Sequence, residues 1–365
     1  MQKIIVSEKE AGQQLLKLLS KYLTKAPQSF FYKMLRKKNI TLNGKKAEGK
    51  EKTNAGDCIC LYVADDTLRL FGGEVLLEQM PLKESVVVQK TGTAATEKAV
   101  GAKRTDAKSA VPEGFTVVYE DADILLVSKF AGLLTQKAAP QDSSLNEKLI
   151  DYLLATGAVT EQELKTFRPA VCNRLDRNTS GLVAAGKTMA GLQFLSEAFR
   201  LRTLDKYYEC IVCGEIREPF RLDGYLQKDE KTNKVHLISS SDYAGLTKTE
   251  QANYAAIKTN GRPLCSRCGM TLLEIELITG KPHQIRAHLA SIGHPILGDT
   301  KYGTSERAEL LRKQFHIKHQ LLHAGRLFFR ETTERFSYLQ SRSFVAPKPK
   351  LFEQVLEKLG MQQSK

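Results

Sequence analysis

Arg168–Thr188 has the sequence RPAVCNRLDRNTSGLVAAGKT, in which charged and turn-forming residues precede an apolar run. Within it, Asp176 lies between Arg174 and Arg177, and nearby positive charge favours the ionised form of a carboxylate. Asn178–Gly181 is rich in turn-forming residues, which can present a side chain at the lip of a pocket. The plainer alternative is an ion pair that only fixes a loop, because structural ion pairs are common.

The central part of this segment resembles a known family signature. Asn173–Gly181, NRLDRNTSG, is similar to His-Arg-Leu-Asp-Arg-x-Thr-Ser-Gly of the large-subunit ribosomal RNA pseudouridine synthase family. Asn173 stands where the signature has histidine, whereas the Arg-Leu-Asp-Arg core is intact. In that family this aspartate is the catalytic nucleophile, so the resemblance implies that role for Asp176. The flanking Arg174 and Arg177 are expected to contact RNA.

Two later stretches resemble further motifs of the same family. Lys206–Gly214, KYYECIVCG, resembles a Lys-x-Tyr motif and implies that Tyr208 stacks on the target base or donates to it. Without the resemblance, Tyr208 would be an ordinary cross-strand aromatic residue. Thr279–His288, TGKPHQIRAH, resembles Thr-Gly-Arg-x-His-Gln-Ile-Arg-x-His and places Arg286 at the arginine that pairs with the nucleophile. Lys281 replaces an arginine, which keeps the charge but loses the bidentate fork. The expected RNA contacts in these stretches are Lys206, Lys281, His283 and Gln284.

The resemblance implies isomerisation of uridine to pseudouridine in RNA. The base detaches through nitrogen 1, turns, and reattaches through carbon 5. Neither oxidation nor transfer of an outside group is involved, so no cofactor is expected. A carboxylate nucleophile can form a covalent adduct, and the target nucleotide must first be flipped out of its stack. Large-subunit ribosomal RNA is the expected substrate, with transfer RNA as the alternative.

Two other classes of protein would account for part of this sequence. A non-catalytic RNA-binding or ribosome-associated protein would need basic surface but has no use for Asp176, Tyr208 and Arg286 together. A glycosidase-like hydrolase would need a second carboxylate about 5 to 10 Å from Asp176. Glu274 and Glu276 are poor candidates, because they fall on the polar face of an expected strand. A hydrolase would also release free uracil.

Residues 1–75 are expected to form a small αβ RNA-binding domain. Apolar residues recur at helical spacing over Leu15–Leu23, Pro27 suits the start of a second helix, and Asn43-Gly44 is a strong hairpin signal. The order resembles the RNA-binding domain first described in ribosomal protein S-four. A basic cluster suits phosphate contacts, although a solvated helix face is the alternative; its members are Lys33, Arg36, Lys37 and Lys38.

The remaining sequence is expected to divide into a linker and a catalytic domain. Residues 76–113 are rich in Ala, Thr, Lys and Gly and predict a flexible linker. Residues 114–362 are expected to form an α+β domain with a mixed, mostly antiparallel sheet, as the resemblance implies. Phe115–Leu134 predicts a hairpin, and Lys129–Gly132 is similar to the family's Lys-Pro-Ala-Gly without its proline. Leu322–Leu327 resembles a fourth family patch that packs under the site.

Composition supports an RNA partner. Lys and Arg total 55 against 41 Asp and Glu, a formal excess of +14, which favours a polyanion, although a well-solvated surface is the plainer reading. The chain has neither a long apolar stretch nor a signal-peptide core, so no membrane span and a cytoplasmic location are expected. Its seven cysteines are expected to be reduced thiols. Cys210-x-x-Cys213 and Cys265-x-x-Cys268 together suggest a four-thiolate zinc site. The first pair falls on an expected strand, which points alternate side chains to opposite faces, so no metal is expected. A monomer is the default expectation.

Overall fold

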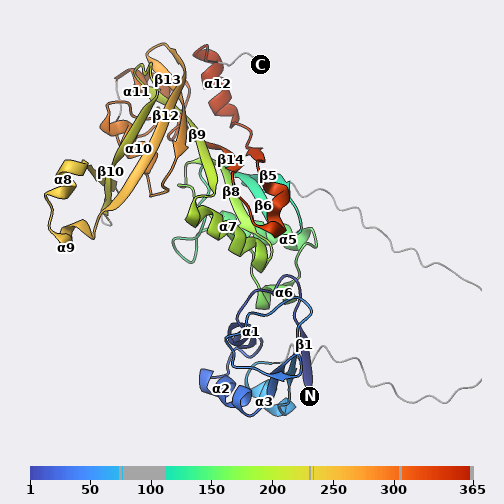
Figure 1. Cartoon of the computed structure of the whole chain (residues 1–365). Helices are drawn as coiled ribbons and strands as arrows, with labels where there is room; N and C mark the ends of the chain where they lie inside the picture. The colour runs from blue at the N-terminus through green and yellow to red at the C-terminus, as the bar shows by residue number, and fades with distance from the viewer. Residues whose placement is uncertain (74–75, 77–111, 230–231, 233, 304–305, 362–365) are drawn as a thin grey trace, which may run out of the picture. The chain divides into compact units, whose positions relative to one another are not determined.

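The computed structural model describes residues 1–73, 76, 112–229, 232, 234–303 and 306–361 (Figure 1). The chain forms two compact units. The smaller unit contains Met1–Val111, Asp151–Arg168 and Thr188–Ala190, and the larger unit contains Pro112–Ile150, Pro169–Lys187 and Gly191–Lys365. The smaller unit therefore also includes a segment from the middle of the chain. Nearly all of the expected linker, residues 76–113, lies outside the described residues.

The smaller unit combines a four-stranded antiparallel sheet with short helices. The strand order is β1-β4-β2-β3, with bounds Gln2–Ile5, Cys58–Leu61, Ile40–Leu42 and Lys45–Lys46. The helices are α1 (Leu15–Tyr22), α2 (Gln28–Arg36), α3 (Asp65–Leu70) and α6 (Glu161–Thr166). The two predicted helices and the hairpin are confirmed. Asn43 and Gly44 both adopt positive φ in the turn, as that turn requires.

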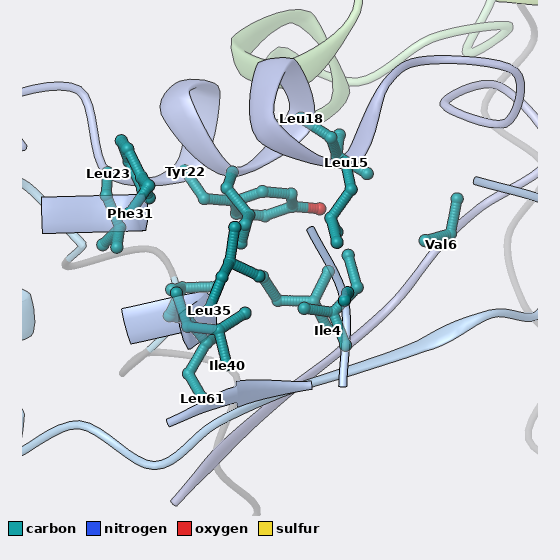
Figure 2. Packing of buried hydrophobic residues seen from close by; sticks show 14 of the residues in the cluster. Ile4, Val6, Leu15, Leu18, Tyr22, Leu23, Phe31, Leu35, Ile40 and Leu61 are labelled. Carbon is teal, nitrogen blue, oxygen red and sulfur yellow. The ribbon is translucent and has the colours of Figure 1, made fainter. Parts of the chain in front are cut away.

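Apolar side chains of α1 and α2 pack onto one face of this sheet. Leu15 and Leu18 of α1 and Phe31 and Leu35 of α2 are buried at 0–2% exposure. Figure 2 shows them meeting strand residues such as Ile40. Burial of each such side chain contributes about 1.5–3 kcal/mol, which is enough to hold short strands together. The basic residues Lys33, Arg36, Lys37 and Lys38 are exposed, on α2 or directly after it.

The larger unit is built on one mixed sheet of eleven strands. The strand order is β11-β10-β12-β13-β9-β14-β8-β6-β5, with β15 on β14 and β7 on β8. Among ladders of described strands, β14 and β8 pair in parallel and the others are antiparallel. The strand bounds are Phe115–Glu120 (β5), Ile124–Lys129 (β6), Ala170–Val171 (β7), Ser180–Gly186 (β8), Leu204–Cys213 (β9), Phe220–Asp229 (β10), Lys234–Ile238 (β11), Ala255–Arg267 (β12), Met270–Leu277 (β13), Leu322–Phe329 (β14) and Ser343–Val345 (β15).

Helices accompany this sheet and complete the predicted α+β class. They are α5 (Leu145–Ala155), α7 (Met189–Leu201), α8 (Ser240–Ala244), α9 (Lys248–Gln251), α10 (Gln284–Ser291), α11 (Glu306–Gln314), α12 (Lys350–Lys358) and the 3-10 helix η1 (Glu334–Leu339). The part of the chain that the structure describes contains no helix with the length and apolarity needed to cross a membrane.

The start of β8 departs from the expected turn. Ser180 and Gly181 are already buried strand residues that pair in parallel with β14. Gly181 has φ +112°, and a Cβ on it would lie 2.2 Å from the carbonyl oxygen of Ala324. Glycine is therefore required by backbone contact as well as by conformation. The Ser180 hydroxyl also hydrogen-bonds His323 Nδ1 at 2.9 Å, so the fourth patch lies beside the central motif.

Candidate active site

Three distant segments of the larger unit line one cavity of about 420 Å³. Asp176 comes from the loop between β7 and β8, Tyr208 from β9, and Arg286 from α10. The sheet brings two of these segments together, because β14 pairs with both β8 and β9. Five of the expected RNA contacts also line the cavity: Arg174, Lys206, Lys281, His283 and Gln284.

Arg286 joins Asp176 to a second, buried carboxylate. Its Nε and Nη2 donate to the two oxygens of Asp299 at 2.7 and 3.0 Å, and its Nη1 approaches Asp176 Oδ2 at 3.4 Å. The Asp299 side chain is 1% exposed, whereas that of Asp176 is 26% exposed. The fork-like contact with Asp299 thus fixes the guanidinium and directs its third nitrogen at the carboxylate that faces the cavity.

The plainer sequence alternative, an ion pair between Asp176 and its flanking arginines, is not what the structure contains. Arg174 and Arg177 are exposed, and no ion pair joins either to Asp176 among the described residues. The positive partner is Arg286, as the family resemblance implies. Arg174 lies at the cavity wall, whereas Arg177 does not line it.

The loop that carries Asp176 is fastened on both sides of this residue. The Thr135 hydroxyl accepts from Leu175 N–H at 3.1 Å and donates to the Leu175 carbonyl at 2.8 Å. The carbonyl of Arg177 accepts from Gly132 N–H at 2.9 Å. Asn173, which departs from the signature, uses its amide to bond the main chain of β8. The loop is therefore rigid where it presents the carboxylate.

Lys129 is a buried lysine beside this loop. It is 0% exposed, and its Nζ donates to the carbonyls of Phe130, Leu133 and Arg177 at 3.0, 2.8 and 3.0 Å. Burial lowers the pKa of Lys129 to about 7, while the charge of Asp176 acts in the opposite direction. Three acceptors match the three N–H donors of an ammonium group. The sequence signal for this residue is its place at the start of Lys129–Gly132, the stretch similar to the family's Lys-Pro-Ala-Gly, which by itself gives Lys129 no role.

Tyr208 is a buried phenol at the cavity wall. Its exposure is 7%, and burial together with the negative charge of Asp176 raises its pKa. The phenol is therefore protonated at neutral pH and can stack or donate, but it is not a base. It also pairs across the sheet with Ile275, so it is a cross-strand aromatic residue as well.

His283 and Gln284 both come from the third motif, but their side chains have different partners. His283 Nδ1 lies 2.7 Å from Tyr302 Oη, and its Nε2 lies 3.9 Å from Asp176 Oδ2. Gln284 is 1% exposed and its amide is fully used, because it donates to Lys258 O and Thr259 Oγ1 and accepts from Thr279 Oγ1 and Lys281 N–H. These bonds hold the segment that leads into α10, and because Gln284 also lines the cavity, its contact with RNA stays a prediction.

The cationic residues expected to contact RNA fall into two groups. In the larger unit, Lys206 is half-buried, and burial with nearby Arg202 lowers its pKa to about 8. Lys206 Nζ lies close to Gly280, because a Cβ on Gly280 would be 3.4 Å from this nitrogen. Arg174 and Lys281 are exposed at the cavity. The other group belongs to the smaller unit and comprises Lys33, Arg36, Lys37 and Lys38.

The cysteine pairs do not converge. Cys213 and Cys265 belong to one hydrophobic cluster, whereas Cys210, three positions before Cys213 on β9, points to the other face of the sheet. All seven cysteines are free thiols. Within the described ranges, no group of three or more His, Cys, Asp or Glu side chains is arranged to hold a metal ion.

The positions of Glu274, Glu276 and Asp299 test the alternative that the protein is a glycosidase-like hydrolase. Glu274 and Glu276 line a different cavity, together with Tyr207, whose side chain lies on the opposite face of β9 from that of Tyr208. Asp299 is near Asp176, but both of its oxygens bind Arg286. Neither arrangement supplies the second free carboxylate that glycoside hydrolysis requires.

Comparisons with known proteins identify the family of this chain. The family model described as RNA pseudouridylate synthase matches residues 123–291. "Ribosomal large subunit pseudouridine synthase C" of Vibrio cholerae is 26% identical over 341 residues, 90% of this chain and 89% of the relative. An uncharacterized RNA pseudouridine synthase of Chlorobaculum parvum is 30% identical over 255 residues, 67% of this chain and 74% of the relative. The structure of human RNA Pseudouridylate Synthase Domain Containing 4 shares the fold, with a TM-score of 0.54 at 21% identity over 71% of this chain and 97% of the human one. The chain therefore belongs to the RNA pseudouridine synthase family and is an RNA isomerase.

Proposed function

We propose that the protein converts a flipped-out uridine of large-subunit ribosomal RNA to pseudouridine, with Asp176 as the nucleophile. The observation that carries the proposal is the pairing of Asp176 with a buried, anchored Arg286 at the wall of a cavity. Among the described residues, only Oδ2 of Asp176 has polar partners, so Oδ1 is the oxygen available for attack. Relatives such as that of Vibrio cholerae are named for the large ribosomal subunit.

The residues around Asp176 supply the conditions for this chemistry. When the bond between ribose and nitrogen 1 breaks, its electron pair leaves with the uracil, and Asp176 forms a covalent bond to the substrate. Arg286 keeps the carboxylate in place and adds positive charge where negative charge develops. Tyr208, which stays protonated, stacks on the base or donates to it.

The RNA is held by charge from both units. Arg174, Lys206 and Lys281 are cations at the cavity and suit contacts with flanking phosphates. Residues 1–75, with the exposed cluster around α2, act as an RNA-binding domain, and residues 114–362 act as the catalytic domain. Arg177 contacts RNA outside the cavity. The chain acts as a monomer, and its net charge of +14 adds affinity that does not depend on sequence.

Release of tritium from RNA labelled at carbon 5 of uridine tests this function, because that proton is lost only when carbon 5 bonds to ribose. We expect release from large-subunit ribosomal RNA and none from transfer RNA. Release from transfer RNA alone would reassign the substrate. Free uracil as the product, or RNA binding without release from any RNA, would contradict the proposal.

Lys129→Met tests whether the fastening of the Asp176 loop matters for the reaction. The change keeps the apolar stem and removes the donor to Arg177 O, so the loop moves and the single-turnover rate falls about 10- to 100-fold. RNA affinity stays within about twofold, because Lys129 does not line the cavity.

Lys187→Met is the matched control for this change. Lys187 is also buried, and it bonds Glu120 and the carbonyl of Asp121 at the far end of the same strands. Its loss lowers the free energy of unfolding without slowing the reaction. Equal rate losses in the two variants would show that Lys129 acts only through general stability.

A further inference from the structure

His283 is held at the cavity in an uncommon backbone conformation. It precedes α10 with φ +53°, in the left-handed region. Non-glycine residues adopt this region seldom because it is strained, and such residues cluster at functional sites. The side chain lines the cavity and is 12% exposed. The fold therefore maintains an imidazole beside Asp176 at some cost in stability.

Tyr302 determines which nitrogen of His283 carries the proton. Tyr302 Oη accepts from Val235 N–H at 3.0 Å and lies 2.7 Å from His283 Nδ1. Among the described residues its own proton has no other acceptor, so Tyr302 donates to Nδ1. In the neutral ring the proton is then on Nε2.

The Nε2–H of His283 remains available to a substrate. It faces Asp176 Oδ2 at 3.9 Å, which is longer than a hydrogen bond. Burial lowers the pKa of His283, and Arg286 and Lys301 act in the same direction, whereas Asp176 and Asp299 act against them. The ring is therefore neutral at pH 7, and it is a fixed donor without a charge.

We propose that neutral His283, held as its Nε2–H tautomer by Tyr302, is a catalytic hydrogen-bond donor to the departing uracil. This inference rests on the proposed function. When the bond from ribose to nitrogen 1 breaks, its electron pair stays on the uracil and is shared with the carbonyl oxygens. The charge disappears again when carbon 5 gives an electron pair to its new bond with ribose. A fixed donor stabilises this charge more than it stabilises the neutral base, so it accelerates the step.

A change in the leaving group separates this role from the positioning of Asp176. Fluorine at carbon 5 withdraws electron density and stabilises the uracil anion by itself. A variant that lacks the donor should therefore be impaired less on 5-fluorouridine than on uridine. A variant that only displaces Asp176 should be impaired equally on both, because the nucleophile is needed in each reaction.

The experiment compares wild type, His283→Leu, His283→Gln and Tyr302→Phe on RNA with uridine or 5-fluorouridine at the target position. The RNA is digested after single turnovers, and loss of the parent nucleoside is followed by liquid chromatography, which separates it from its isomer, with RNA affinity and thermal unfolding measured in parallel. We expect His283→Leu to react about 100-fold more slowly on uridine and about 10-fold or less more slowly on 5-fluorouridine. His283→Gln, which keeps an N–H donor, should lose less. Tyr302→Phe keeps the imidazole of His283 but removes its partner. Its rate should also fall more on uridine than on 5-fluorouridine, by smaller factors than for His283→Leu.

Equal losses on the two substrates, or full activity of His283→Leu on uridine, would overturn the role of His283 and leave the proposed function standing. A wild type that converts neither nucleoside in any RNA would overturn the proposed function, and the role of His283 with it.

Discussion

Asp176→Asn abolishes tritium release, with a single-turnover rate at least about 10⁴-fold below wild type. An amide has the shape of the carboxylate but cannot ionise, so it does not attack the substrate. The fold is retained, because Arg286 keeps both of its contacts with the buried Asp299. RNA binding is unchanged or slightly tighter, since a negative charge has been removed from a cavity with a cationic rim.

The matched control is Asp151→Asn, the same change at an exposed position on α5. It should leave rate and affinity unchanged. The comparison needs single-turnover conditions, with enzyme in excess over labelled RNA, so that slow product release does not hide the chemical step. A residual rate of Asp176→Asn within about tenfold of wild type would rule out Asp176 as the nucleophile.

The outline of the fold is predictable from the sequence because the relevant signals are local. Helical spacing over Leu15–Leu23 and the Asn43-Gly44 turn depend on neighbours along the chain, and the structure has both. The alternation of apolar and polar residues around Glu274 and Glu276 likewise predicts a strand, and β13 lies there. Ser180 and Gly181 instead suggest a turn, because the parallel partner β14 that makes them a strand lies more than a hundred residues away.

The sequence predicts those residues of the site that match a family motif with a known role. The resemblance identifies Asp176 and Arg286, and in the structure Arg286 Nη1 lies 3.4 Å from Asp176 Oδ2. It gives no roles to Asp299 or Tyr302, although both lie in Gly293–Gly303, where the resemblance to the third motif continues. Their roles depend on contacts across the fold, to Arg286 and to His283, which spacing along the chain does not encode.

Lys129 and Gln284 also show that the partners of a buried polar side chain are not predictable from the sequence. The resemblance includes Lys129 only as the first residue of Lys129–Gly132, and it does not indicate that the side chain is wholly buried with its amine bonded to three carbonyls. A glutamine in an RNA-binding motif suggests a contact with RNA, and the structure adds that the amide of Gln284 bonds Thr279 before α10 and Lys258 of β12. Burial of a polar side chain depends on the partners that folding supplies.

Arg286→Lys slows the reaction about 10²- to 10³-fold while RNA affinity stays within a few fold. The arginine uses two nitrogens to bind Asp299 and a third to approach Asp176. A lysine keeps the charge but has one nitrogen on a flexible stem, so it binds the buried Asp299 and leaves Asp176 without its partner. The variant therefore separates the presence of positive charge from its geometry.

The control for this change is Arg262→Lys. Arg262 forms an exposed ion pair with Glu274 at 2.8 Å, away from the catalytic cavity, and such pairs contribute about 0–1 kcal/mol. It should leave the rate unchanged. If Arg286→Lys reacted as fast as wild type, a positive charge near Asp176 would be sufficient, and the anchoring by Asp299 would serve only to balance a buried charge. If Arg286→Met were no slower than Arg286→Lys, the geometry of the fork would account for the whole effect, because the retained charge of lysine would then contribute nothing.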